Sequence, residues 1–280
     1  MDAPALAEAE VAAQARARRD LQVCLCFFAL AFGLCMPMIV LDKLPPHDVS
    51  ERYAPMVREL AAGNWQAAFM PRIQPLLVLL SAPWARLGFH PFTALKLTSV
   101  LLFAAGVFPL YHLSRRVFDR NVASWTVMAY VFCAKLMQYA GDGLRETGKT
   151  TFLLLALAGL MAFFRGERRF RQALQIGAGA AFLALIRGET LVYSLAALAA
   201  LLLMDSSVRE HQQARRRWRF PRYAATAIAV FMLLISPWVF YICQATGYPV
   251  TDVRQAVVLY QLGRGLGLPM PKPPIVSFPP

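Results

Sequence analysis

The stretch "LQVCLCFFALAFGLCMPMIVL", from Leu21 to Leu41, decides the class of fold. It contains no Asp, Glu, Lys, Arg or His, and about 20 such residues in a helix are long enough to cross a bilayer. Arg16, Arg18 and Arg19 precede it. The apolar run is longer than that of a signal peptide and no small-residue cleavage site follows it, so a retained membrane anchor is predicted.

The rest of the chain is also rich in apolar residues. Of its 280 residues 58% are hydrophobic and 16% charged, with a mean hydropathy of +0.47; ordinary soluble domains are roughly 45–50% apolar and 25% charged. Further apolar segments that could cross the membrane lie near residues 94–113, 122–140, 150–164, 173–188, 190–204 and 224–243. The sequence therefore predicts an all-α bundle of about seven transmembrane helices.

The positive charges predict how this bundle is oriented. The apolar stretch 75–89 is short and contains Pro83 and Arg86, so we expect it to lie at the membrane surface instead of crossing. Every cytoplasmic loop then carries a basic cluster, as the positive-inside rule requires. The clusters are Arg115, Arg116 and Arg120; Arg165, Arg168, Arg169 and Arg171; and Arg209, Arg215, Arg216, Arg217, Arg219 and Arg222.

This arrangement predicts a multi-pass protein of the cell (inner or plasma) membrane, with residues 1–20 in the cytoplasm. The transmembrane module spans residues 21–243, with an outer loop at 42–93, and residues 244–280 form a Pro/Gly-rich outer tail. The net charge of +13 is explained by short basic clusters between apolar segments. Nucleic-acid binding is not expected, because no basic face with interleaved aromatic residues is present.

Residues 143–150, "GLRETGKT", match the phosphate-binding pattern G-x-x-x-x-G-K-[ST]. That loop needs a strand before it and a helix after it, whereas here it joins two predicted membrane helices on the outer side. No ATP or GTP binding is therefore predicted at Gly143–Thr150. The five cysteines form no C-x-x-C pair and are interpreted as packing residues.

The outer loop is the most informative region for function. From Asp48 to Leu60 apolar residues recur at helical spacing, with Asp48 at the expected N-cap and Gly63 ending the helix. A second surface helix is expected from Pro75, with Trp84 at the level of the lipid headgroups. His47 is interpreted as a solvent-exposed neighbour with no second metal ligand at helical spacing, and no metal site is predicted.

The segments "HDVSERYAPMVRELAAGNW" (47–65) and "PRIQPLLVLLSAPWARLGF" (71–89) resemble the first outer loop of GT-C glycosyltransferases, such as protein O-mannosyltransferases and the lipid A aminoarabinose transferase. The matching positions are Asp48, Arg52, Tyr53, Gly63, Asn64, Trp65, Pro75, Leu76, Leu87 and Gly88. The likeness continues more loosely through "GLRET" and "LIRGET". The sequence departs from the family pattern at Arg72 and Gln74, where relatives often carry a glutamate or lysine.

The resemblance implies an inverting glycosyltransferase that moves a sugar from a polyprenyl-phosphate donor to an acceptor hydroxyl at the outer membrane face. It implies Asp48 as the general base, with Glu51 and Asp42 as competing carboxylates. Cations near the leaving phosphate would stabilise its charge. The candidate residues that bind the lipid phosphate or the sugar are Arg52, Tyr53, Arg72, Arg145, Lys149 and Arg187.

Several alternatives stay open. A transporter or flippase-like carrier of a lipid-linked solute is one, although no internal repeat is visible. Because the resemblance covers only an N-terminal seven-span module, the chain could also be a minimal enzyme, a piece of a longer one or an inactive scaffold. No cofactor is predicted, with a divalent metal near Asp48 left open, and the acceptor is unassigned among lipid, glycan and protein. Membrane lipids are the other expected partner.

Overall fold

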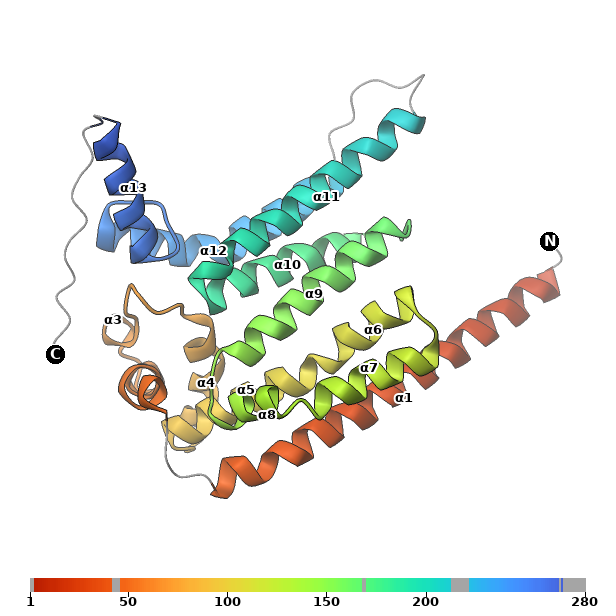
Figure 1. Cartoon of the computed structure of the whole chain (residues 1–280), viewed down its shortest axis with the longest axis horizontal. Helices are drawn as coiled ribbons and strands as arrows, with labels where there is room; N and C mark the ends of the chain where they lie inside the picture. The colour runs from red at the N-terminus through yellow and green to blue at the C-terminus, as the bar shows by residue number, and fades with distance from the viewer. Residues whose placement is uncertain (1–2, 42–45, 168–169, 213–221, 267, 269–280) are drawn as a thin grey trace.

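The computed structural model describes residues 3–41, 46–167, 170–212, 222–266 and 268. Over these residues the chain contains helices and turns and no strand, as the composition predicts (Figure 1). Four helical segments are long and apolar enough to cross a membrane: Gln14–Leu41 within α1 (Ala3–Leu41); Pro91–Val117, formed by α5 (Pro91–Ala105) and α6 (Val107–Val117); α9 (Glu146–Phe164); and α12 (Arg222–Thr246).

The remaining predicted spans are shorter or interrupted. α10 (Phe170–Ile186) and the apolar part of α11 (Leu191–Gln212) are shorter apolar helices, joined by the single turn η2 (Gly188–Thr190). The continuous helix expected over 122–140 is wrong: the chain leaves the helical conformation at Cys133, between α7 (Arg120–Val131) and α8 (Ala134–Gly141). The count of seven spans stays a prediction.

The first loop folds into short helices that pack on the bundle. It contains the π-helical turn η1 (Val49–Tyr53), α2 (Ala54–Ala61), α3 (Trp65–Ala68) and α4 (Leu76–Arg86). Gly63 has a φ of 89°, a left-handed conformation that favours glycine, and it ends the helix as the sequence predicts. One face of α4 is buried against its neighbours, because Leu77 and Val78 are almost inaccessible while Leu79 and Leu80 are exposed.

Small residues let the central helices approach closely. α10 packs between α9 and α12 (Figure 1). A Cβ atom at Gly177 would lie 2.4 Å from the Ala227 carbonyl oxygen, and one at Gly179 would lie 2.9 Å from the Ala156 nitrogen. Such small-residue contacts are the usual basis of helix association inside a membrane, where water provides no hydrophobic driving force.

The charged residues separate to two ends of the bundle. At one end, here called the N-terminal end, Asp20 lies 3.9 Å from Arg115 and from Arg120, and Arg116 lies 3.2 Å from Glu167. The first loop and the turns at 142–145 and 187–190 lie at the other end, here called the loop end (Figure 1). The described parts of the predicted cytoplasmic loops thus share one end, as the predicted topology requires. The third basic cluster lies almost wholly outside the residues whose side chains are described.

Candidate active site at the loop end

Tyr53 lies at the loop end, where the charges of several side chains act on it. It comes from η1, and its side chain is buried. Burial raises the pKa of the Tyr53 hydroxyl, and the charges of Arg145, Glu146, Asp48 and Arg187 all act on it. Residues from three parts of the chain that are distant in sequence thus influence the Tyr53 hydroxyl, and its raised pKa keeps it protonated near neutral pH.

Asp48 belongs to this group, but it does not cap the helix as expected. Its backbone is already helical, with φ −57° and ψ −37°, and its side chain makes no capping hydrogen bond. Instead Asp48 Oδ1 lies 3.2 Å from Arg52 Nη1, one helical turn later, and 59% of each side chain is exposed. The carboxylate of Asp48 is thus open to solvent and paired with a cation. Of the two competing carboxylates, Glu51 pairs with His47 at 3.0 Å, and Asp42 lies outside the described residues.

Arg187 links two glutamates. Its Nη1 donates to Glu146 Oε1 at 2.9 Å, and its Nε donates to Glu189 Oε2 at 3.0 Å. Glu189 is two residues from Arg187 in the chain, whereas Glu146 is 41 residues away. The other oxygen of Glu146, Oε2, is buried and has no hydrogen-bond partner among the described residues. A buried carboxylate oxygen without a donor is uncommon and points to a ligand position.

Gln74 connects the first loop to the segment that follows α12. Its Nε2 donates to Asp252 Oδ2 at 3.0 Å, and Arg145 Nη1 donates to its Oε1 at 3.5 Å. Gln74 and Asp252 are both buried. Gly188 packs against both, because a Cβ atom there would lie 2.5 Å from Gln74 Nε2 and 2.8 Å from Asp252 Oδ2. Asp252 lies in the region assigned to the outer tail, which also forms the helix α13 (Val253–Gly265).

Two cations of the site have no carboxylate partner among the described residues. Arg145 stands at the N-cap of α9 and bonds only the neutral amide of Gln74, and Lys149 follows one turn later on the same face. Both side chains are partly buried. Arg72, also predicted as a phosphate ligand, is exposed. Arg145 and Lys149 are therefore the cations best placed to receive an anion.

The "GLRETGKT" segment connects two helices, as the sequence predicts. The helix α8 enters it and α9 begins at Glu146, so it lies between two helices and not between a strand and a helix. Gly143 has a φ of 74°, and a Cβ atom there would lie 3.2 Å from the backbone nitrogen of Lys96. The glycine thus serves a tight turn against α5. Absence of nucleotide binding stays a prediction.

The expectation that His47 has no partner at helical spacing is wrong, because His47 Nδ1 lies 3.0 Å from Glu51 Oε2 at i,i+4. Both side chains are largely exposed. No group of three or more His, Cys, Asp or Glu residues within the described part of the chain could hold a metal ion. The pair by itself is too small a ligand set for a structural metal.

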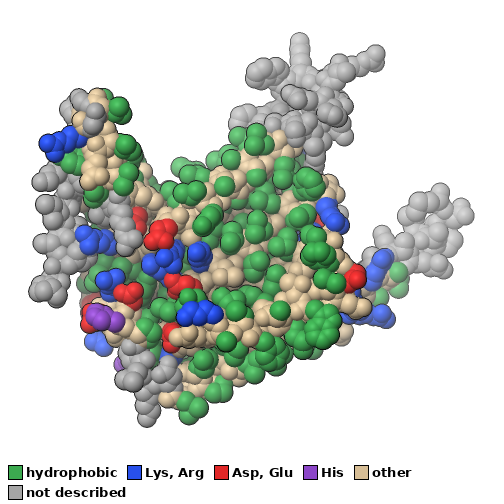
Figure 2. Space-filling model, viewed as in Figure 1, with side chains coloured by type: hydrophobic (Ala, Val, Ile, Leu, Met, Phe, Trp, Pro, Cys, Tyr) green, Lys and Arg blue, Asp and Glu red, His purple; other side chains and the backbone are tan. Residues whose placement is uncertain are grey.

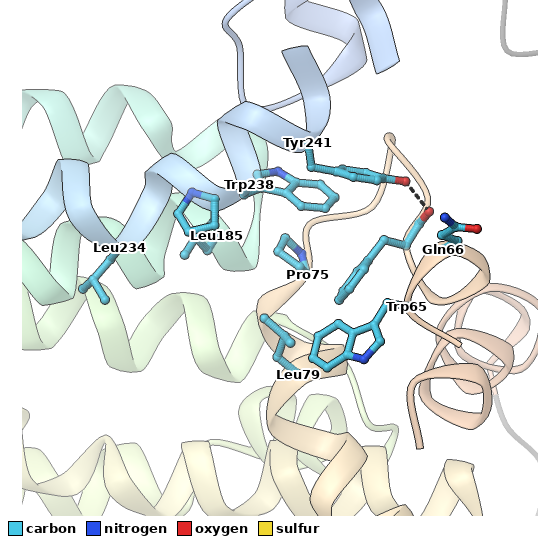
Figure 3. A pocket seen from close by; sticks show the side chains of 10 residues that line it. Trp65, Gln66, Pro75, Leu79, Leu185, Leu234, Trp238 and Tyr241 are labelled. Carbon is cyan, nitrogen blue, oxygen red and sulfur yellow. Dashed lines mark hydrogen bonds between the residues drawn. The ribbon is translucent and has the colours of Figure 1, made fainter. Parts of the chain in front are cut away.

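An apolar cavity of about 460 Å³ lies beside the charged group. Figure 3 shows Trp65 from α3 and Trp238 from α12 facing the same space, with Pro75, which precedes α4, between them and Leu79 of α4 beside Trp65. Pro75 follows Gln74 directly, and the indole nitrogen of Trp238 donates to the Thr251 carbonyl at 2.9 Å, next to Asp252. Figure 2 shows charged side chains gathered at the loop end, beside a flank of largely hydrophobic side chains.

Sequence reasoning identified Asp48, Tyr53, Arg145 and Arg187 but missed Glu146, Gln74 and Asp252. Glu146 lies inside the "GLRET" segment, where only the neighbouring cations Arg145 and Lys149 were predicted as ligands. Gln74 was noticed only as a departure from the family pattern, and its hydrogen bond to Asp252 exists only in the folded chain.

Comparison with known proteins gives the family of the chain. Residues 74–241 match the family described as dolichyl-phosphate-mannose-protein mannosyltransferase. No curated protein and no solved structure gives a significant match. The family match covers more than half of the chain and includes Gln74, Arg145, Glu146 and Arg187. The protein therefore belongs to the dolichyl-phosphate-mannose-protein mannosyltransferase family of GT-C membrane glycosyltransferases.

Proposed function

We propose that this protein transfers a sugar from a polyprenyl-phosphate donor to an acceptor hydroxyl at the outer membrane face, with inversion of the anomeric carbon. The observation that carries the proposal is the position of the 460 Å³ apolar cavity directly beside the buried polar residues at the loop end. A polyprenyl-linked sugar has the same division, with an apolar tail joined through a phosphate to a polar head.

The phosphate would bind at the start of α9. The unpaired N–H groups of a helix N-terminus favour an anion, and Arg145 and Lys149 add two cations with no carboxylate partner among the described residues. As the bond between the anomeric carbon and the phosphate oxygen breaks, negative charge grows on the phosphate. Fixed cations at that point stabilise the transition state more than the ground state.

The tail would leave the phosphate through the apolar cavity. Leu79 and Leu234 line it from α4 and α12, and Trp65 and Trp238 close its sides (Figure 3). An isoprenoid chain contributes affinity here in proportion to the apolar area that it buries from water. The cavity thereby fixes the reacting end of the donor near the cations.

Asp48 is the proposed general base. Its carboxylate accepts the proton of the acceptor hydroxyl as that oxygen attacks the anomeric carbon, and polyprenyl phosphate leaves as the anion. Its exposure suits contact with an acceptor that arrives from water. Glu146 is a further candidate carboxylate, because its buried oxygen Oε2 has no hydrogen-bond partner within the described ranges. Its pairing with Arg187 favours a role in binding a sugar hydroxyl.

The test uses purified protein in proteoliposomes with a panel of polyprenyl-phosphate sugars and hydroxyl acceptors. The proposal expects release of polyprenyl phosphate only when an acceptor is added, and a product of inverted configuration. Movement of intact donor between leaflets without release would identify a carrier instead. If the donor is neither cleaved nor moved, while it still binds, the chain acts as a non-catalytic scaffold.

A further inference from the structure

A second cavity, of about 490 Å³, lies at the N-terminal end of the bundle, opposite the candidate active site. It lies between α6, α9, α10 and the start of the apolar part of α1. Its walls combine cationic and amide side chains with apolar ones. Neither the proposed reaction nor the family match explains a polar cavity at this end.

The polar wall carries an excess of positive charge. Arg171 is exposed and forms no ion pair with any described residue, whereas Arg116 lies 3.2 Å from Glu167. With His112 neutral, two arginines and one glutamate leave one positive charge on the wall. An anion approaching Arg171 therefore meets net attraction, and the glutamate is already compensated by Arg116.

The second observation is a buried acceptor without a donor. Gln172 follows Arg171 and is only 7% exposed, yet its Oε1 has no hydrogen-bond partner among the described residues. Gln175, one turn later, is held by a 3.0 Å bond from its Nε2 to the Leu155 carbonyl. A buried amide oxygen that is left unpaired costs stability, so a hydroxyl donor at this point would be favourable.

The apolar wall is formed by Leu21, Phe108 and Leu155 from three different helices. Leu21 is 52% exposed and begins the apolar part of α1, where a membrane surface is expected. A ligand that fills this cavity thus has an anionic group, a hydroxyl donor and an apolar chain.

We propose that this cavity binds an anionic phospholipid whose headgroup carries a hydroxyl group, of the phosphatidylglycerol type. The lipid phosphate accepts hydrogen bonds from Arg171, with Arg116 nearby. A headgroup hydroxyl donates to Gln172 Oε1, and an acyl chain runs over Leu21, Phe108 and Leu155. The site does not depend on the proposed transferase activity, and it would hold the start of α1 against α6 and α10.

The experiment measures lipid binding to the detergent-purified protein by native mass spectrometry. Phosphatidylglycerol, phosphatidic acid, phosphatidylcholine and inorganic phosphate are added in turn. We expect phosphatidylglycerol to bind at least about tenfold more tightly than phosphatidylcholine, the low end of what a hydrogen bond to a charged group contributes. We expect inorganic phosphate not to displace it, because the ion lacks the apolar chain.

Two variants separate the contacts. Arg171→Gln should reduce phosphatidylglycerol binding about tenfold or more, whereas Arg165→Gln, an exposed arginine near the same end, should leave it unchanged. Gln172→Leu removes the buried acceptor without creating an unpaired group, and should abolish the preference for phosphatidylglycerol over phosphatidic acid. Equal binding of phosphatidylglycerol and phosphatidylcholine, or full displacement by inorganic phosphate, would overturn the proposal. So would equal losses in Arg171→Gln and Arg165→Gln.

Discussion

Gln74 and Asp252 are 178 residues apart in the chain, yet they share a buried hydrogen bond of 3.0 Å. Gln74 is the first residue of the family match and Asp252 lies beyond its end. Through its other amide atom Gln74 accepts a hydrogen bond from Arg145, the cation at the start of α9. The segment after α12 thus helps to hold Arg145, which is proposed to bind the phosphate.

Gly188→Ala should destabilise the loop end, because the added methyl group would lie within 2.5 Å of Gln74 Nε2 and 2.8 Å of Asp252 Oδ2. Overpacking of this kind costs about 1–3 kcal/mol. Thermal unfolding in detergent should show a lower midpoint for this variant. The matched control is Gly33→Ala in α1, where no atom lies within 4 Å of the added methyl group. If both variants unfold at the wild-type temperature, the close packing at Gly188 is not present.

Asp48→Asn should insert and purify normally, because Asp48 makes no capping bond and its pairing with Arg52 is largely exposed. Loss of a positioned general base should lower sugar transfer by at least about 100-fold, with donor binding retained. Asp42→Asn should have a much smaller effect.

The variant Glu146→Gln tests whether Asp48 or Glu146 is the general base. If Asp48 is the base, this variant should raise KM for the donor more than it lowers kcat, since Glu146 then only binds substrate. A fall of about 100-fold in kcat for Glu146→Gln, with more than about a tenth of activity kept in Asp48→Asn, would move the base to Glu146.

Arg145→Gln and Lys149→Gln should each weaken binding of the polyprenyl-phosphate donor by about tenfold or more, because each removes a charged contact to the phosphate. The fold should be kept, since neither side chain pairs with a described carboxylate. Arg165→Gln, at the other end of α9, is the control and should bind the donor normally. Donor titration by fluorescence or calorimetry measures the effect. Equal affinity in all four proteins would show that the phosphate binds elsewhere.

Leu79→Trp should fill part of the 460 Å³ cavity and exclude the lipid tail. We expect a higher KM for the polyprenyl donor with a smaller change in kcat, because the chemical groups are untouched. Leu80→Trp is a matched control: Leu79 and Leu80 are both 37% exposed, but Leu80 does not line the cavity. Similar kinetics for the two variants would contradict the proposed path of the tail.

Tyr53→Phe should alter the response of stability to alkaline pH. Burial raises the pKa of the Tyr53 hydroxyl above its usual value of about 10. The contribution of this group to stability is then fully present below about pH 10 and is lost as pH rises through the folded-state pKa. Thermal unfolding across this range should show less alkaline destabilisation in Tyr53→Phe than in the wild type. The exposed Tyr193→Phe should behave like the wild type.

The sequence by itself determined the membrane class, the helical content and most of the helix positions. Apolar runs such as Leu21–Leu41 have no alternative to helix in a bilayer, because each backbone N–H and C=O must be bonded within its own segment. Positive φ at Gly63 and the helix break there were likewise local properties. The family resemblance of the outer loop marked Asp48 and Tyr53, and the position of Arg187 directly after an apolar run marked that residue.

Only the tertiary structure decided which of these residues meet. Local patterns placed an N-cap at Asp48 and a continuous helix at 122–140. Asp48 is instead already helical and pairs with Arg52 one turn later, and the helix breaks at Cys133. Glu146, Gln74 and Asp252 entered the site through contacts between segments far apart in sequence. Such contacts depend on how helices pack, at places such as Gly177 and Gly188 where the absence of a side chain allows close approach. Helix packing is a property of several segments at once, so no single stretch of sequence encodes it.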